Sequence, residues 1–278
     1  MRKQILIHYS LNTNLNECTA TTFVSDTPCP YSGSHLSYPS GTHTFTNVDF
    51  THCSSSDDHG GAIKCTGGDT ELTVTGCTFR ECHTSTSLSK RGGGVNVDAV
   101  KIVTIKACLF VECSGYYGGG LCINDTQSTP SLSDCVFFSC KAHYLGGEAF
   151  VGLCTKSAST IACNDCIFIK GNNVSLSTYL RGGGFYLDIY ENTHANAISN
   201  NLFTGNSVNN RGGGLAIFQE NTGLSYSIQF CFFTDNFASD NGQDVYLQRI
   251  NVNSILHCFA TSNALDRLYT TISVTQTS

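Results

Sequence analysis

The chain has 278 residues, a formal net charge of −6, and only 13% charged residues. Its Lys and Arg side chains are scattered, which argues against a nucleic-acid partner, because such a protein needs a basic stripe that displaces counterions. Abundant Gly with little Pro is typical of a β-rich, turn-rich protein and not of a helical one.

The N-terminal region carries no repeat. Residues 1–42 are rich in Ser, Thr and Pro, and include Cys18 and Cys29. The apolar run at Ile5–Ile7 is too short for an ordinary signal peptide, which a trimmed N-terminus would explain equally well, and no stretch is long enough for a membrane span. We expect residues 1–42 to form a leader and an N-terminal cap, because the open end of a solenoid exposes strand edges.

A unit of about 30 residues recurs about eight times across residues 43–263. Its first motif is Cys-x-Phe-x-x-Cys, with a second apolar position three residues before the first Cys. The clear copies begin at Cys77, Cys108 and Cys135, and the looser copies begin at Val48, Cys166, Asn201, Cys231 and Cys258. In the later copies Asn206, Asn236 and Asn263 replace the second Cys. We interpret these Asn residues as corner positions with left-handed backbone, which Asn tolerates.

The second motif is a Gly-Gly pair followed by alternating apolar residues. It begins at Gly60, Gly92, Gly118, Gly146, Gly182 and Gly212, with a degenerate copy at Gly242. Alternation with period 2 predicts a half-buried strand, and the Gly pair predicts a sharp corner with positive φ before it.

Short strands of this kind cannot bury their inner faces alone. If each unit makes one coil, equivalent strands stack about 4.8 Å apart as parallel sheets, with like side chains in inward ladders. The sequence therefore predicts an all-β parallel β-helix of about eight coils, with three short strands per coil over residues 43–263 and a C-terminal cap or tail at 264–278.

The residues Gly60-Gly61-Ala62-Ile63 resemble the Gly-Gly-Ala-apolar motif of polymorphic outer-membrane protein repeats. Phe203-x-x-Asn206 and Phe233-x-x-Asn236 are similar to the companion Phe-x-x-Asn motif. The resemblance covers about residues 45–263 and implies a right-handed parallel β-helix of the pectin-lyase-like type. It also implies a surface-exposed, adhesin-like role, and a location at the cell surface or outside the cell.

Enzymes on pectin-lyase-like folds need clustered carboxylates on one outer face. The compact acidic cluster is Asp57-Asp58-His59, which we interpret as a solvated loop because neighbouring coils have no matching Asp pair. Cys163-x-x-Cys166 suggests a metal or redox pair, but structural zinc takes four ligands and both positions belong to the apolar ladders. We expect mostly free, buried thiols, and neither a metal nor a cofactor. The Cα spacing of adjacent coils also permits disulfides, although their Cβ atoms lie slightly farther apart than a disulfide prefers.

Two further features lie on the predicted exterior. Arg91, Arg181 and Arg211 each precede a Gly triplet, where they contact solvent or a small anion or glycan. Asn124 and Asn173 begin glycosylation sequons, which matter only in a secreted protein.

One sheet is predicted to show an apolar outer face. If the Cys and Phe side chains point inward, the alternate residues point outward. We call six of them the apolar stripe: Leu109, Val111, Val136, Phe138, Ile167 and Ile169. Contiguous apolar surface marks a partner or a covering segment.

The sequence therefore predicts a non-enzymatic β-helix that serves for surface-type binding or adhesion, with a protein or glycan partner on its exterior. A polysaccharide lyase or glycoside hydrolase on the same fold is the alternative. The pattern leaves the ligand and the oligomeric state open.

Overall fold

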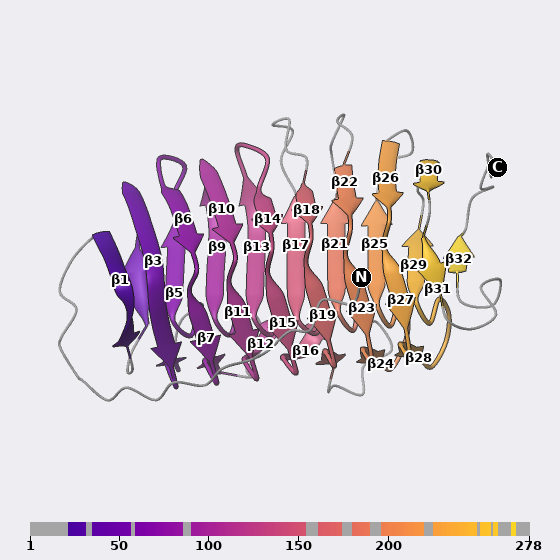
Figure 1. Cartoon of the computed structure of the whole chain (residues 1–278), viewed down its shortest axis with the longest axis horizontal. Helices are drawn as coiled ribbons and strands as arrows, with labels where there is room; N and C mark the ends of the chain where they lie inside the picture. Colours follow the sequence, from indigo (N-terminus) through magenta and orange to yellow (C-terminus); the bar gives the residue numbers. More distant parts are fainter. Residues whose placement is uncertain are drawn as a thin grey trace.

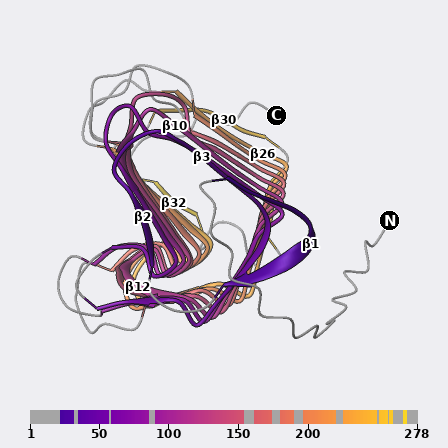
Figure 2. The same cartoon turned by 90° about the vertical axis from the view of Figure 1, so that its left-hand side faces the viewer.

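The computed structural model is an all-β parallel solenoid, as predicted. It describes residues 22–31, 35–56, 59–85, 90–153, 161–173, 180–189, 196–219, 225–248, 251–256, 258–260 and 268–270. The coils follow one another along the long axis, from indigo at the N-terminal end to yellow at the C-terminal end (Figure 1). Seen from one end, successive coils share one outline (Figure 2).

The strands form three sheets, and paired strands such as β10 and β14 or β13 and β17 run parallel. The first sheet has 16 strands in two arms, which meet because the long strand β3 (Thr42–Thr51) belongs to both. β1 (Thr22–Tyr31) pairs with β3 at the N-terminal end of this sheet.

The arm that starts with β6 comprises β6 (Glu71–Thr75), β10 (Ile102–Lys106), β14 (Ser131–Ser133), β18 (Ala162–Asn164), β22 (Asn196–Ser199), β26 (Ser225–Gln229) and β30 (Asn251–Leu256). The arm that starts with β7 comprises β7 (Thr78–Arg80), β11 (Leu109–Val111), β15 (Val136–Phe138), β19 (Ile167–Ile169), β23 (Leu202–Thr204), β27 (Phe232–Thr234) and β31 (Phe259–Ala260).

The second sheet comprises β4 (Ser54–Ser55), β8 (His83–Thr84), β12 (Ser114–Tyr117), β16 (Lys141–Leu145), β20 (Asn172–Asn173), β24 (Ser207–Val208) and β28 (Phe237–Ala238). The third sheet comprises β2 (Leu36–Tyr38), β5 (Ile63–Thr66), β9 (Val95–Val100), β13 (Leu121–Thr126), β17 (Ala149–Leu153), β21 (Phe185–Ile189), β25 (Leu215–Gln219), β29 (Val245–Gln248) and β32 (Leu268–Thr270).

A complete coil has four strands and not the predicted three, as β10, β11, β12 and β13 illustrate. The missed strand follows the second Cys of each motif, where the residues are mostly polar and show no apolar alternation. Between β4 and β28 the described chain completes about six turns. The third sheet runs from β2 to β32, so it extends past both residue 43 and residue 263.

The core contains a stack of Phe rings, one from each successive Cys-x-Phe motif. The centroids of neighbouring rings from Phe50 to Phe233 lie 4.6 to 5.0 Å apart, and the planes of neighbouring rings are nearly parallel. These Phe side chains are buried, which confirms that Cys and Phe point inward. Because offset-stacked rings attract one another beyond their buried area, this stack holds adjacent coils in register.

The Gly-Gly pairs form the predicted corners. The first Gly of each pair has positive φ, for example 64° at Gly92 and 59° at Gly118. Where the corner is Gly-Gly-Gly, the third Gly faces the Phe stack. A Cβ atom at Gly120 would lie 3.1 Å from Cβ of Phe110 and 3.2 Å from Cδ1 of Phe137. The corner therefore needs Gly both for its backbone conformation and for space beside the rings.

The interchange of Cys and Asn has a different cause from the one expected. Positive φ occurs at the preceding residue, such as Gly205 (64°) and Asp235 (55°), so Asn206 and Asn236 are not the left-handed positions. Their side-chain amides donate to buried carbonyls of the preceding coil, as Asn206 Nδ2 does to Phe168 O at 3.0 Å.

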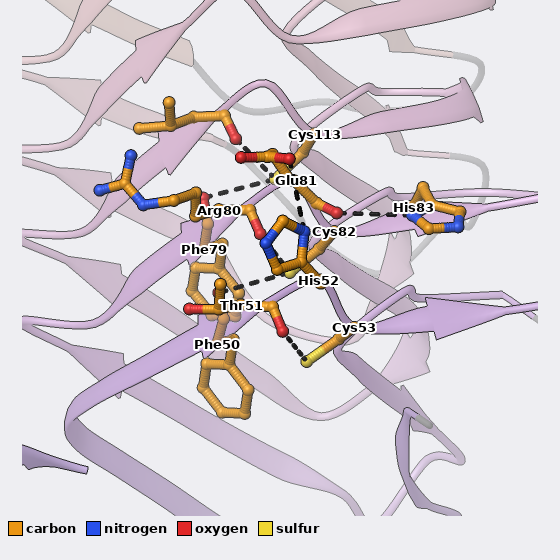
Figure 3. A network of polar contacts seen from close by, with 11 residues as sticks. Phe50, Thr51, His52, Cys53, Phe79, Arg80, Glu81, Cys82, His83 and Cys113 are labelled. Atoms are coloured by element: carbon orange, nitrogen blue, oxygen red, sulfur yellow. Dashed lines mark hydrogen bonds and ion pairs between the residues drawn. The ribbon is translucent and has the colours of Figure 1, made fainter. Parts of the chain in front are cut away.

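Cysteine thiols fill the same role in the earlier coils. Cys113 Sγ donates to Phe79 O at 3.4 Å, and Cys82 Sγ donates to Phe50 O at 3.5 Å (Figure 3). Cys and Asn thus both donate a hydrogen bond to the carbonyl of a buried Phe in the preceding coil, which is why they exchange in the repeat. The cysteines whose side chains the structure describes are all free, and all but Cys258 are buried.

Candidate binding groove

A groove of about 440 Å³ lies on the outer face of the third sheet, beside the Gly-Gly corners. Its walls come from five successive coils, and the lining residues are Arg91, Tyr117, Asn124, Tyr144, Leu145, Phe150, Gly152, Arg181, Tyr186, Asp188 and Phe218. Concave sites that combine aromatic side chains with a few polar groups are the usual form of a ligand site.

The floor of the groove consists of the residues between the two inward apolar positions of each third-sheet strand. Cys122, Phe150 and Tyr186 are register partners on β13, β17 and β21, so they form one outward column. Phe150 and Tyr186 stack with centroids 5.7 Å apart and form a second, smaller apolar cluster outside the main core.

A second outward column passes through Asn124, Gly152 and Asp188. Gly152 has no side chain between the two polar neighbours, and this absence opens the groove at its middle. A Cβ atom at Gly152 would lie 3.0 Å from Cε1 of Phe150 and 3.3 Å from Oδ1 of Asn124. A larger residue at this position would therefore project into the groove.

One wall of the groove is a cluster of Tyr side chains on β12 and β16. Tyr117 and Tyr144 meet edge to face with centroids 5.5 Å apart, and Tyr144 stacks on Tyr116 at 5.5 Å. Tyr117 also lies 5.3 Å from Phe150 on the floor. Partial burial raises the pKa of the Tyr117 hydroxyl, so it stays a neutral donor at physiological pH.

Arg91 and Arg181 stand at the two ends of the groove, with Tyr117 and Leu145 in the coils between them. At one coil per about 4.8 Å, these two Arg residues are separated by about 14 Å along the axis. Arg91 lies over the Tyr117 ring at 5.8 Å, and Arg181 lies over the Phe218 ring at 4.9 Å.

The groove carries charges of both signs. Arg91 Nη1 lies 3.7 Å from Asp98 Oδ2, and Asn124 Nδ2 donates to Asp98 Oδ1 at 2.7 Å. Asp188 lies at the other end near Arg181. Two guanidinium groups and two carboxylates thus leave the region nearly neutral, with donors and acceptors close to aromatic faces.

Of the three predicted Arg residues, the structure brings Arg91 and Arg181 to the groove and places Arg211 outside its lining. Arg211 Nε donates to Asp240 Oδ2 at 3.0 Å, and Arg211 Nη1 donates to Tyr246 OH at 2.8 Å. The groove itself was not predicted from the sequence. Its signal was the series of aromatic residues between the paired apolar positions, as at Phe150 and Tyr186.

The apolar stripe lies on the outer face of the β7 arm, as the alternation predicted. Leu109, Val136 and Ile167 are register partners, and the column continues to Leu202 and Phe232. These side chains are partly exposed, and Phe232 is 40% exposed. A parallel column joins Val111, Phe138 and Ile169.

A second hollow of about 590 Å³ lies near the bend between the β7 arm and the second sheet. There His52 Nδ1 lies 3.3 Å from Glu81 Oε2, and His83 Nδ1 lies 3.4 Å from the Glu81 carbonyl oxygen (Figure 3). His52 and Glu81 are 63% and 47% exposed, so water screens this pair. Among the described residues, no group of His, Cys, Asp and Glu could hold a metal ion.

The other residues considered from the sequence as sites are the acidic cluster Asp57-Asp58-His59 and the pair Cys163 and Cys166. Asp57 and Asp58 lie outside the described residues, while His59 Nδ1 accepts a hydrogen bond from the Arg91 amide at 3.0 Å. Cys163 and Cys166 are buried in the core.

The two sequons differ in what the structure describes. Asn124 lines the groove, and Asn173 ends β20 with a side chain outside the described set. If Asn124 carried a glycan, the glycan would occupy the groove.

Comparison with known protein families, curated proteins and solved structures finds no match to this chain. In the part of the chain that the structure describes, no helix has the length and apolar character to cross a membrane.

Proposed function

We propose that this chain is a non-enzymatic binding module of the surface or adhesin type, related to the polymorphic outer-membrane repeats and to right-handed pectin-lyase-like helices. The Gly-Gly corners and the Phe-x-x-Asn bends support the relationship. Both are structural devices of the coil, because Gly92 has positive φ and Asn206 caps a buried carbonyl. A rod built in this way offers long exterior faces for contact.

The ligand that the groove accommodates best is an extended carbohydrate. The observation that supports this is the joint presence of Tyr rings, two guanidinium groups and the Asp188 carboxylate in one groove, with Asp98 beside it balancing the charge. Aromatic faces pack against sugar rings, while Asn124, Asp188 and Arg181 offer acceptors and donors for hydroxyl groups. Balanced charge favours a neutral saccharide over a highly charged polymer.

A lyase or hydrolase on the same fold is the second candidate. Asp98, which contacts the groove residues Arg91 and Asn124, and Asp188 in the groove are three register steps apart, or about 14 Å. Glycosidase carboxylates lie about 5 to 9.5 Å apart. In the second hollow, Glu81 and Glu112 follow one another on adjacent coils, which suits that spacing. Both are exposed, however, and a catalytic acid needs a site that excludes water.

Closing the groove should abolish carbohydrate binding. We expect Gly152→Asn to weaken binding of the best saccharide on a glycan array by at least about tenfold, because the new side chain fills the middle of the groove. Tyr117→Ala should weaken it as well, through loss of a ring on the wall. Titration calorimetry with that saccharide measures both effects.

The matched control is Glu112→Gln in the second hollow, which should bind saccharide as the parent does. Lyase and hydrolase activity should be assayed on the same samples. If Gly152→Asn keeps such activity and Glu112→Gln loses it, the protein is instead a lyase or hydrolase that acts at the second hollow. Binding unchanged in a folded Gly152→Asn variant would contradict the groove as the site.

The apolar stripe is the proposed surface for a protein partner or for self-association. We expect the double variant Val136→Asp and Ile167→Asp to remain folded, because both side chains point outward, and to lose that association. Light scattering and circular dichroism measure the two properties. An oligomeric state and a fold that both stay unchanged would exclude the stripe from self-association.

A further inference from the structure

The first position of each Cys-x-Phe motif forms a ladder along the core. Cys231 and Cys258 are its last two members in the part of the chain that the structure describes. Phe232 and Phe259 are register partners on β27 and β31, so Cys231 and Cys258, which precede them, are neighbours on adjacent coils. Cys258 Sγ donates to Ile228 O at 3.6 Å, just as Cys231 Sγ donates to Ile198 O at 3.7 Å. Both thiols therefore point inward along one line.

This pair differs from the interior pairs of the ladder because solvent reaches one of its thiols. Cys108, for example, is buried between Cys77 and Cys135, and its amide donates to Cys135 Sγ at 3.5 Å. Among the described cysteines, Cys258 alone is partly exposed. β31 is also the last strand of this arm in the part of the chain that the structure describes, where it pairs with β27.

The two thiols also differ in the direction of their pKa shifts. A hydrogen bond from Cys231 lowers the pKa of Cys258. The pKa of Cys231 is raised, first by its hydrogen bond with Cys258 and then by burial. A partly exposed thiol with a lowered pKa beside a second thiol is the usual arrangement of a cysteine that oxidises first and of the cysteine that then reacts with it.

We propose that Cys258 is an oxidation site for peroxides and that Cys231 then closes a disulfide with it. In the first step the Cys258 thiolate attacks one peroxide oxygen, so the S–O bond forms, the O–O bond breaks and hydroxide leaves. In the second step Cys231 loses its proton and attacks the sulfenic sulfur, so the S–S bond forms, the S–O bond breaks and water leaves. Hydrogen peroxide is the oxidant, and it receives the two electrons.

The spacing of neighbouring strands allows this bond. Neighbouring strands place the two Cα atoms about 4.8 Å apart, within the range of disulfides, whereas the Cβ atoms lie slightly farther apart than a disulfide prefers. Among the strands that the structure describes, β31 pairs with β27 alone, whereas an interior strand pairs on both sides. The bond would fasten β30 and β31 to the coil before them.

The test treats the full folded chain with a modest excess of hydrogen peroxide, then blocks remaining thiols and maps the peptides without reduction. We expect a linked peptide pair containing Cys231 and Cys258, with a mass about 2 Da below that of the two reduced peptides. Cys258→Ser should abolish this product. Cys231→Ser should stop the reaction at a sulfenic acid that dimedone traps. The matched control is Cys108→Ser, an interior ladder position, which should leave the product unchanged.

Circular dichroism before and after treatment verifies that the chain stays folded. Absence of the linked pair, equal cross-linking of the interior pairs, or loss of the linked pair in Cys108→Ser would each overturn the proposal. The inference is independent of the carbohydrate groove, because the two cysteines lie at the end of the core and the groove lies on the outer face of the third sheet.

Discussion

Phe137→Ala should cost about 3 to 5 kcal/mol of unfolding free energy, the largest effect we expect from one substitution in the core. Phe137 is fully buried, and its ring stacks between Phe110 at 4.6 Å and Phe168 at 5.0 Å. Removing the ring leaves a cavity that the rigid coils above and below cannot close, and it breaks the stack in its middle. Equilibrium denaturation in urea, followed by circular dichroism, measures the loss.

The adjacent residue provides the control. Phe138 belongs to the same strand and to the apolar stripe, but it points outward and is partly exposed. Phe138→Ala removes the same group of atoms and should cost only about 1 kcal/mol, because water already reaches the ring. Equal costs for the two variants would refute the assignment of the inward face.

Glu148→Gln should make the protein more stable at neutral pH and leave it nearly unchanged in acid. Glu148 occupies the third position of a Gly-Gly-x corner and is fully buried. Burial raises the pKa of its carboxyl well above the ordinary value, and backbone groups of nearby residues lower it by less. The folded chain therefore keeps a proton on Glu148 where the unfolded chain has lost it.

The sign of the effect follows from this difference. An unfolded Glu has a pKa of about 4.3, so the stability of the parent is full below that pH and falls as the pH rises, by about 1.4 kcal/mol per pH unit. The fall continues up to the raised pKa of the folded state. Gln carries no proton to lose, so its variant should become more stable than the parent as the pH rises above the pKa of the unfolded Glu.

Denaturation curves across a series of acidic to neutral pH values measure this slope. The control is Glu112→Gln, which changes an exposed Glu and should keep the slope of the parent. A Glu148→Gln variant that shows the same pH dependence as the parent would rule out a protonated carboxyl in the core.

Much of the coil could be predicted from the sequence, because its rules are local. Alternation with period 2 decides which residues point inward, and the buried Phe79, Val97 and Ile123 follow it. A Gly pair decides where the chain turns sharply, as at Gly92. The strand at Ser114–Tyr117 escaped prediction because its residues are mostly polar and its partners lie on other coils.

The exchange of Cys for Asn was recognised in the sequence, but its reason was not. The sequence shows that Asn206 stands where Cys113 stands in an earlier coil. It does not show that both groups satisfy a carbonyl of the coil before, because that carbonyl belongs to a residue more than thirty positions away. The break in this ladder at Gly171 also has a remote cause. A Cβ atom there would lie 2.3 Å from Cγ of Glu148.

By itself the sequence determined the solenoid, its inward ladders and its Gly corners, since each depends on neighbours within a few residues. The tertiary structure alone decided the groove on the exterior. The groove exists because Arg91, Tyr117 and Arg181 come from different coils and because Gly152 leaves a gap between Asn124 and Asp188. Such sites depend on how coils stack, and stacking joins residues that no local pattern connects.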